Sequence, residues 1–279
     1  MGEEDNWNAY LWPSDEGPGA TMLRNKYGLH NRAALTQREY DETTDRSLEL
    51  ATGQVQLPQS RDAAHLKAVH RHLFQDVYDW AGEYRTVNME KGGRAFLDYR
   101  YLDEWLEQSF AQMSATRWSS LDHEQFADAA AAGFAMINYA HPFREGNGRS
   151  SRIFLQQCTS DGQFELDFTV IAQQSERWNE ASRLSVPPHY GGLPDPDPLR
   201  GIFREIAVGA GAQEVAGVED DDCIEAVRAS FPLPATEAVR ASFPLPATEA
   251  VRTPPQLGDT ARAQPYREQD YGRDSDYGR

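Results

Sequence analysis

Apolar side chains recur at steps of three and four residues along four stretches of this chain, and this spacing predicts amphipathic helices. The first stretch runs from Ala63 to Trp80 and is expected to end near Gly82. The second covers residues 99–113, and the last covers residues 149–157. The pattern therefore predicts that helices dominate the middle of the chain.

The third stretch carries its own start and stop signals. Asp122 is a plausible N-cap, and Gln125 follows it three residues later, as in a capping box. Apolar positions then continue to Ala140. The helix is expected to stop at His141, because Pro142 disfavours the helical conformation of the residue before it.

A short segment between the first two helices has a different character. Residues 86–99 read TVNMEKGGRAFLDY, and Lys91, Gly92 and Gly93 separate two short parts of mixed polarity. Adjacent glycines supply the positive φ angles of a tight turn. The segment is predicted to be a β-hairpin or a flexible flap.

The composition changes at Val208. The sequence EAVRASFPLPAT occupies residues 225–236, recurs unchanged at 237–248 and begins again as EAVR. Its Pro-x-Pro step is incompatible with a continuing helix or a central strand. We predict one globular unit over residues 1–207 and a disordered tail over 208–279. The repeat is either a replication expansion without function or a series of Phe-Pro-Leu-Pro docking motifs.

The net charge limits the kinds of partner that this protein can bind. The chain has 27 Lys and Arg against 44 Asp and Glu, a net charge of −17. This charge repels nucleic acid and anionic lipid but allows one nucleotide in a local pocket.

No apolar run approaches the roughly 18 residues of a membrane span, and the acidic start is unlike a signal peptide. Cys158 and Cys223 suit neither a disulfide framework nor a metal site. We expect a cytoplasmic protein.

The residues from His141 to Arg152 read HPFREGNGRSSR. Gly146 and Gly148 allow backbone amides to converge on an anion at the start of a helix. Arg149 and Arg152 lie three residues apart, on one helical face, and guanidinium groups suit phosphate oxygens. The run therefore predicts a cradle for a polyphosphate.

Two further side chains add chemistry to this cradle. Glu145 would repel phosphate unless a divalent cation lay between them, which predicts bound Mg²⁺. A neutral His141 between the two helices could take a proton from an attacking hydroxyl. A single His-Pro is more often a helix cap, and an arginine pair is more often solvated, so the argument depends on their combination.

The run resembles the signature of the Fic family, HPFx[D/E]GNGRxxR, and matches every specified position. Residues 23–35, 72–85 and 91–96 also resemble family segments, so the similarity covers roughly residues 20–207. The resemblance implies an all-α, mainly helical fold with a β-hairpin flap over the active site. It also implies transfer of AMP from ATP to a Ser, Thr or Tyr hydroxyl of a target protein, with release of pyrophosphate.

The same resemblance implies individual roles. His141 would be the general base, Phe143 a buried anchor and Glu145 the Mg²⁺ ligand. The nucleotide- and phosphate-binding residues would be Arg144, Gly146, Asn147, Gly148, Arg149 and Arg152. The flap residues that contact the target or the nucleotide would be Lys91, Gly92, Gly93 and Arg94.

Two sequence details refine the expected activity. Family members that act as kinases carry Lys at the position of Gly148, so Gly148 favours nucleotidyl transfer; the choice of ATP over other nucleotides follows from the resemblance. Active members are restrained by a helix with the pattern [S/T]xxxE[G/N], whose Glu pairs with the arginine at the position of Arg152. Neither Glu16 nor Glu145, the two glutamates followed by Gly, fits that pattern. We expect a toxin restrained by a separate small antitoxin.

Two alternatives remain at this stage. One is a catalytically idle binding module in which the proline-containing tail is the working part. The other is an enzyme of the same fold that removes AMP or transfers a different phosphate-containing group. Labelling of a lysate with radioactive ATP separates both from an AMP transferase.

Overall fold

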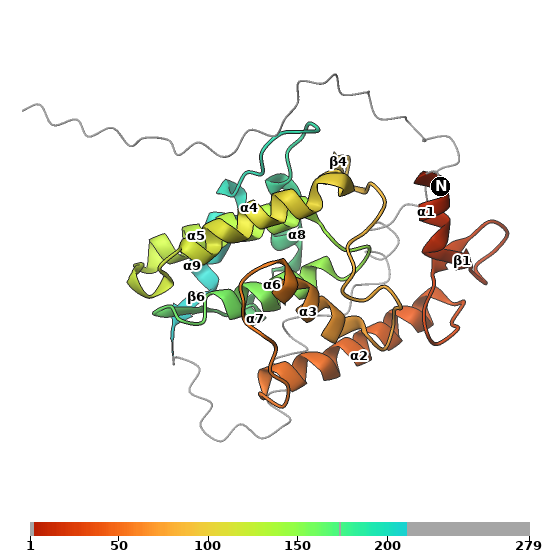
Figure 1. The fold of residues 1–279 in the computed structure, drawn as a ribbon, viewed down its shortest axis with the longest axis horizontal. Helices are drawn as coiled ribbons and strands as arrows, with labels where there is room; N and C mark the ends of the chain where they lie inside the picture. Colours follow the sequence, from red (N-terminus) through yellow and green to blue (C-terminus); the bar gives the residue numbers. More distant parts are fainter. Residues whose placement is uncertain (1–2, 173, 211–279) are drawn as a thin grey trace, which may run out of the picture.

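Helices make up most of the described chain, and small antiparallel strand pairs join them (Figure 1). The computed structural model describes residues 3–172 and 174–210. The longer helices are α2 (Arg32–Ala51), α3 (Ala63–Phe74), α4 (Leu102–Ala115), α5 (His123–Ala140), α6 (Asn147–Cys158), α8 (Ser175–Ser185) and α9 (Asp197–Ile206). Shorter ones are α1 (Glu3–Ala9), α7 (Thr169–Ala172), η1 (Tyr99–Tyr101) and η2 (Trp118–Ser120). The mainly helical fold class is therefore confirmed.

The strands form three separate pairs. The pairs are β1 (Leu11–Pro13) with β2 (Thr21–Leu23), β3 (Glu90–Lys91) with β4 (Arg94–Ala95), and β5 (Phe164–Leu166) with β6 (Ala207–Gly209). Because β6 continues to Gly209, the packed unit includes two residues beyond the predicted boundary at 207. The twelve-residue repeat and Cys223 lie outside the described residues.

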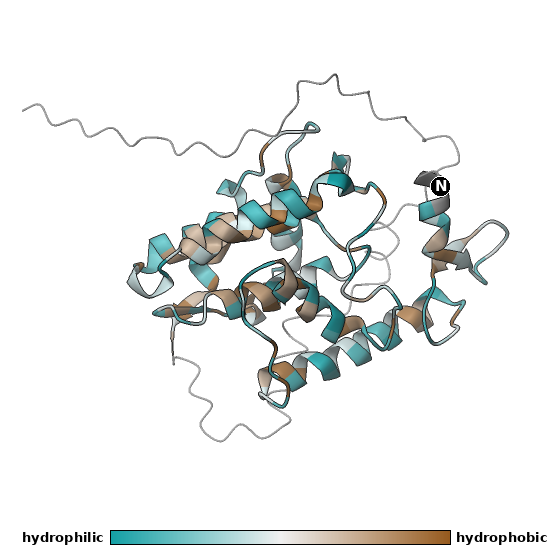
Figure 2. Ribbon diagram, viewed as in Figure 1, coloured by the Kyte–Doolittle hydropathy of each residue, from teal (hydrophilic) through white to brown (hydrophobic). Residues whose placement is uncertain are grey.

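Helix α5 lies at the centre of the core, where it contacts α4, α6, α8 and α9. Small buried residues such as Ala127, Ala130 and Gly133 allow these close approaches. The central helices carry hydrophobic segments (Figure 2), and many of these residues belong to one buried core cluster. The predicted capping box is confirmed, since Asp122 and Gln125 exchange side-chain and backbone hydrogen bonds. The core thereby fixes the end of α5, where the HPFREGNGRSSR run begins.

Helix α3 is shorter than the predicted helix to Trp80, which is a correction. It ends at Phe74, and the chain continues in turns up to Gly82. The ring of Tyr78 stacks on the ring of Trp80 with centroids 4.3 Å apart, which a helix does not allow for residues two positions apart. Lys26 also donates its Nζ to the carbonyl of Gln75 and its backbone N–H to the carbonyl of Val77, which stabilises the turns that follow α3.

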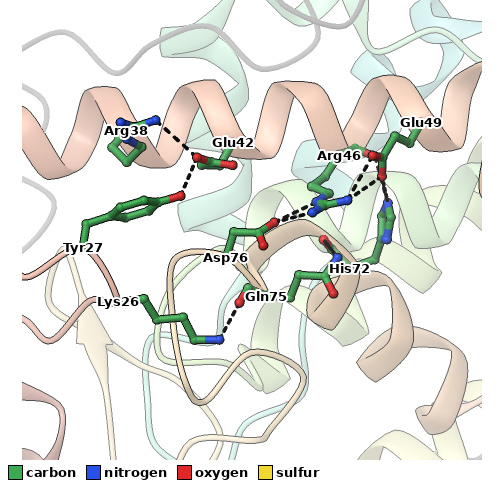
Figure 3. A network of polar contacts seen from close by, with 9 residues as sticks. All are labelled: Lys26, Tyr27, Arg38, Glu42, Arg46, Glu49, His72, Gln75 and Asp76. Atoms are coloured by element: carbon green, nitrogen blue, oxygen red, sulfur yellow. Dashed lines mark hydrogen bonds and ion pairs between the residues drawn. The ribbon is translucent and has the colours of Figure 1, made fainter.

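A network of charged and polar side chains holds α2 against the end of α3 (Figure 3). Arg46 lies at its centre, 2.7 Å from Asp76 and 3.0 Å from Glu49. His72 also contacts Glu49, at 3.1 Å. The network thus stabilises the packing of α2 against α3.

The predicted β-hairpin is confirmed. Lys91 pairs with Arg94, and Gly92 and Gly93 form the turn with φ angles of 58° and 74°. Positive φ at both central residues matches the right-handed twist of a two-residue hairpin. None of the helices in the described ranges is long and apolar enough to cross a lipid bilayer.

Candidate active site

One short loop joins the end of α5 to the start of α6, and its own side chains hold it closed. Asn147 accepts the backbone N–H of Phe143 at 2.8 Å and donates to the carbonyl of Phe143 at 2.7 Å. Phe143 is fully buried, and its ring stacks on His70 with centroids 3.7 Å apart. The side chain of Asn147 therefore shapes the loop, and only its backbone amide is left for a ligand.

Gly146 and Gly148 lack a side chain for different structural reasons. Gly146 is the N-cap of α6 with φ +78°, and a Cβ there would lie 2.2 Å from Cζ of Phe74. Packing and backbone conformation thus both require glycine at 146. Gly148 has helical φ, and a Cβ there would meet no protein atom within 4 Å. Because the protein does not fill this space, the absence of a side chain at 148 lets a ligand approach the backbone.

The first turn of α6 has a backbone geometry that suits an anion. The first amides of a helix have no partner within the helix. In the described chain no side chain caps this end, since the N-cap residue is Gly146. Exposed amides and the positive end of the helix dipole favour phosphate oxygens there.

His141 lies at the opposite end of the loop, in the left-handed conformation with φ 43° and ψ 57°. Its ring stacks on Phe96, just after the flap, with centroids 3.8 Å apart and an angle of 10° between planes. Burial lowers the pKa of His141 well below 6.5, and the charges of Arg85 and Lys91 lower it further. The imidazole is therefore neutral at physiological pH, the state that accepts a proton.

Arg149 lies in a network that α2 completes. Its guanidinium forms an ion pair with Glu39 and donates to Thr43 Oγ1 at 3.0 Å. Glu145 lies 3.9 Å from the same guanidinium, and Tyr78 donates its hydroxyl to the other oxygen of Glu39. Two carboxylates therefore share one arginine beside the start of α6.

This sharing sets the charge states of the network. Burial raises the pKa of Glu145, and the nearby Glu39 raises it further, while Arg149 opposes both. Burial would lower the pKa of Arg149, but the two carboxylates raise it above its ordinary value. A cation next to Glu145 would relieve the repulsion between the two carboxylates.

Arg152, one turn later, has different surroundings. Its guanidinium lies over the ring of Trp178 in α8, 5.0 Å from the centroid, and 5.9 Å from that of Phe168. Burial and, to a smaller extent, the charge of Arg149 together lower the pKa of Arg152 to about 10. The structure thus brings the two motif arginines near each other while packing them against different helices.

Arg144 lies on another side of the loop. Its guanidinium is buried and lies 4.7 Å from the ring centroid of Trp7 in α1. Burial lowers its pKa, and the carboxylate of Glu145 acts in the opposite direction. Among the residues expected to bind phosphate, Arg144 is thus packed against the N-terminal helix.

Three of the predicted flap residues are exposed, and the fourth, Arg94, binds the end of α8. Lys91, Gly92 and Gly93 are exposed at the tip. Arg94 donates to the carbonyls of Leu184, at 3.1 Å, and of Val186 at the end of α8. Arg94 therefore anchors the flap, whereas its tip is available to a partner.

Sequence reasoning missed several residues that shape the site. His70 of α3 accepts the N–H of Gly82 at 2.8 Å and contacts the carbonyl of Glu145 at 3.0 Å. These partners require a neutral ring with the proton on Nε2, and burial lowers the pKa of His70 to about 3. Glu39 carried no sequence signal, because its partner Arg149 is 110 residues away.

Known proteins were compared with this chain. The family model described as the Fic/DOC family matches residues 60–158. A probable protein adenylyltransferase Fic of Salmonella typhimurium is 32% identical over 189 residues, which cover 67% of this chain and 88% of the relative. One of Escherichia coli is 29% identical over 198 residues, covering 71% of this chain and 93% of the relative.

Solved structures show the same fold. The BepC protein of Bartonella tribocorum, crystallised with bound AMPPNP, has a TM-score of 0.62 and 26% sequence identity. The alignment covers 72% of this chain and 97% of that one. The similarity extends well beyond the HPFREGNGRSSR run.

Proposed function

Because the chain belongs to the Fic/DOC family, we propose that it is a protein adenylyltransferase that transfers AMP from ATP to a hydroxyl side chain of a target protein. The observation that carries the proposal is the loop between α5 and α6. It places a histidine with a strongly lowered pKa at one helix end and an uncapped, anion-binding turn at the next helix start. A base and a phosphate site at the two ends of one short loop suit attack of a hydroxyl on a phosphorus atom.

In the proposed reaction, His141 acts as the general base. The target oxygen attacks the α-phosphorus of ATP, its proton passes to the imidazole, and the bond between the α-phosphorus and the bridging oxygen breaks. Pyrophosphate leaves, and a phosphodiester links AMP to the target. The lowered pKa of His141 keeps the ring ready to accept the proton at neutral pH.

The phosphates would lie at the start of α6. The amides of Asn147 and Gly148 supply donors, whereas that of Gly146 donates to Oε1 of Glu145 at 2.9 Å, and Arg149 and Arg152 supply positive charge. Support comes from the open space in front of Gly148 and from the burial of both guanidinium groups. Arg144 is less well placed for phosphate, since it packs on Trp7.

Glu145 is the proposed Mg²⁺ ligand. In the described chain no group of three or more His, Cys, Asp or Glu is arranged to hold a metal by itself. Glu145 nevertheless fits, because Mg²⁺ is commonly held by one or two carboxylates together with substrate phosphates. When bound, the ion would neutralise charge on the phosphates.

The flap is the proposed docking place of the target. The exposed turn at Lys91, Gly92 and Gly93 presents a short strand edge, and an extended segment can pair with such an edge through backbone hydrogen bonds. Replacing Gly92 and Gly93 with proline should lower target modification more than ATP binding. Equal losses would assign these residues to the nucleotide instead.

The deciding experiment is transfer of labelled AMP. The full chain, incubated with α-³²P-ATP and a cell lysate, should label at least one protein that stays unlabelled in lysate alone, and with γ-³²P-ATP it should add no label to that of lysate alone. Added label from the γ-phosphate would show a kinase, and nucleotide binding without any added label would show a binding module.

We further propose that the chain is a toxin acting in the cytoplasm, where ATP is available. Its sequence lacks an internal [S/T]xxxE[G/N] segment, so a separate antitoxin would supply the inhibitory Glu to Arg152. Expression without that partner should arrest growth, and a small neighbouring reading frame with the motif should relieve the arrest. Harmless expression with labelling confirmed in the same cells contradicts this role.

A further inference from the structure

Arg85 is a buried arginine that lies between the flap and the loop of the candidate site. It is 2% exposed. Its Nε donates to the carbonyl of His141 at 2.8 Å, and its Nη2 donates to that of Ala140 at 3.1 Å. Its backbone N–H donates to the carbonyl of Pro142 at 2.8 Å. Arg85 therefore holds three successive carbonyls at the end of α5.

The same guanidinium reaches the flap. Nη1 donates to the carbonyl of Val87 at 2.5 Å, and Nη2 also donates to the carbonyl of Leu97. Val87 precedes the first strand of the hairpin and Leu97 follows the second. Both legs of the flap thus share one side chain with the end of α5.

Arg85 is a buried cation whose hydrogen bonds go to the backbone. Burial lowers its pKa to about 10, against the opposing charge of Asp98. Its side-chain hydrogen bonds are to backbone carbonyls. The last carbonyls of a helix carry partial negative charge, so the end of α5 compensates a buried cation. The planar guanidinium presents five donors on three nitrogens, so it reaches carbonyls that lie farther apart than those a lysine ammonium can reach.

The peptide that Arg85 holds is an unusual one. His141 adopts positive φ, a conformation that side chains with a Cβ rarely take, and Arg85 binds the carbonyls on both sides of it. The imidazole stacks on Phe96, which directly follows the flap. The orientation of the ring therefore depends on the contacts that also fix the flap.

We propose that Arg85 is a positioning residue that ties the flap to His141, so that a target segment held by the flap meets the base in one fixed orientation. This inference rests on the proposed transferase activity. In this arrangement Arg85 contacts neither ATP nor the target. Its loss should lower the rate of transfer and leave the affinity for ATP largely intact.

Two substitutions at this position separate geometry from charge. Arg85→Lys keeps the positive charge and loses the fork, whereas Arg85→Met removes both. With saturating Mg²⁺ and ATP, we expect kcat for target labelling to fall at least about tenfold in Arg85→Lys and further in Arg85→Met. The Kd for ATP, from calorimetry, should change less than about threefold. Arg24→Lys is the matched control, because Arg24 also donates to a backbone carbonyl, that of Leu11, outside the site.

The pH profile separates the loss of the positive charge from the loss of the guanidinium fork. Arg85 is one of the positive charges that lower the pKa of His141. The acid limb of kcat should therefore move to higher pH in Arg85→Met and stay nearly unmoved in Arg85→Lys. An unchanged kcat in both variants, or losses of kcat and ATP affinity of the same size, would overturn the proposal.

A measurement on the wild-type chain covers the case in which the variants do not fold. Native-state hydrogen exchange should show the amides of Arg85, Leu97 and His141 opening together, with one denaturant dependence. These amides donate to carbonyls of the motif loop and of α5. Independent opening of the flap leg would refute the coupling even if the chain proved to have no transferase activity.

Discussion

The end of α5 and the start of α6 are joined by one short loop, yet the protein treats their backbone groups in opposite ways. At the end of α5, Arg85 binds the carbonyls of Ala140 and His141. At the start of α6, the N-cap is Gly146 and no side chain of the described residues caps the helix. One end is satisfied internally, and the other leaves its donors to a ligand.

This difference shows how a single loop combines rigidity with binding. A buried cation and a stacked ring fix His141, so the base needs little reorganisation before the reaction. The start of α6 is equally well supported from behind, by Phe74 against Gly146, but is open in front of Gly148. The structure therefore supports the loop on its buried side and leaves open the side where phosphate would bind.

The largest expected effect comes from removing the base at the end of α5. His141→Ala should lower AMP transfer by about 10² to 10⁴-fold, because it removes the proton acceptor. ATP affinity should change little, since the anion site lies at the start of α6. Filter-binding transfer assays and calorimetry measure the two quantities. His30→Ala, which alters an exposed histidine stacked on Trp12, is the control, and retained labelling in His141→Ala would remove His141 from the mechanism.

The two glycines test the supported and open sides of α6. Gly146→Ala should destabilise the fold by about 3 kcal/mol or more, because its Cβ would overlap Phe74 and its φ is positive. Gly148→Ala should change the free energy of unfolding by only about 1 kcal/mol in either direction, since it has free space and helical φ. Urea unfolding measures both. Similar losses in the two variants would mean that the space at Gly148 is part of the packed core.

A larger side chain at residue 148 tests whether ATP binds in the open space there. Gly148→Leu should weaken ATP binding about tenfold or more, because leucine would occupy the space in front of the first turn of α6. Circular dichroism should show an unchanged helical content. Normal ATP affinity in this variant would place the phosphates elsewhere.

The pH dependence tests the other end of the loop. Only the neutral form of His141 accepts a proton, and its pKa lies well below 6.5. As the pH falls, transfer should therefore persist through 6.5 and decline only at lower pH. Initial rates at saturating Mg²⁺ and ATP between pH 5 and 8 measure this. A decline centred at 6.5 or above in kcat would show that His141 is not buried as described while it reacts.

The smallest effect is expected from the C-terminal residues. Truncation after residue 210 should shift Tm by no more than a degree or two and leave AMP transfer unchanged, because the removed sequence contains little apolar surface. Differential scanning fluorimetry measures the Tm of the truncated chain, and the transfer assay measures its activity. A loss of several degrees would mean that the packed unit extends beyond Ala210.

Local signals accounted for much of the fold. The apolar spacing predicted α4, α5 and α6, and the pair of Asp122 and Gln125 predicted the start of α5. Gly92 and Gly93 predicted the hairpin turn. These features depend on residues that are near one another in the chain, so sequence spacing is enough to find them. The predicted extension of α3 to Trp80 was wrong, because Lys26, from outside that segment, binds the carbonyls of Gln75 and Val77, and the rings of Tyr78 and Trp80 stack on each other.

The sequence by itself determined the chemistry available in the loop: a histidine before a proline, an acid, two glycines and two arginines within twelve residues. Only the tertiary structure decided how those groups are held. Glu39 reaches Arg149 from α2, Trp178 lies beneath Arg152, and Arg85 joins the flap to the end of α5. Such contacts arise when the helices pack, and they join residues far apart in the chain, so no local pattern specifies them. Burial then lowers the pKa of His141, because only the packed core removes water from the ring.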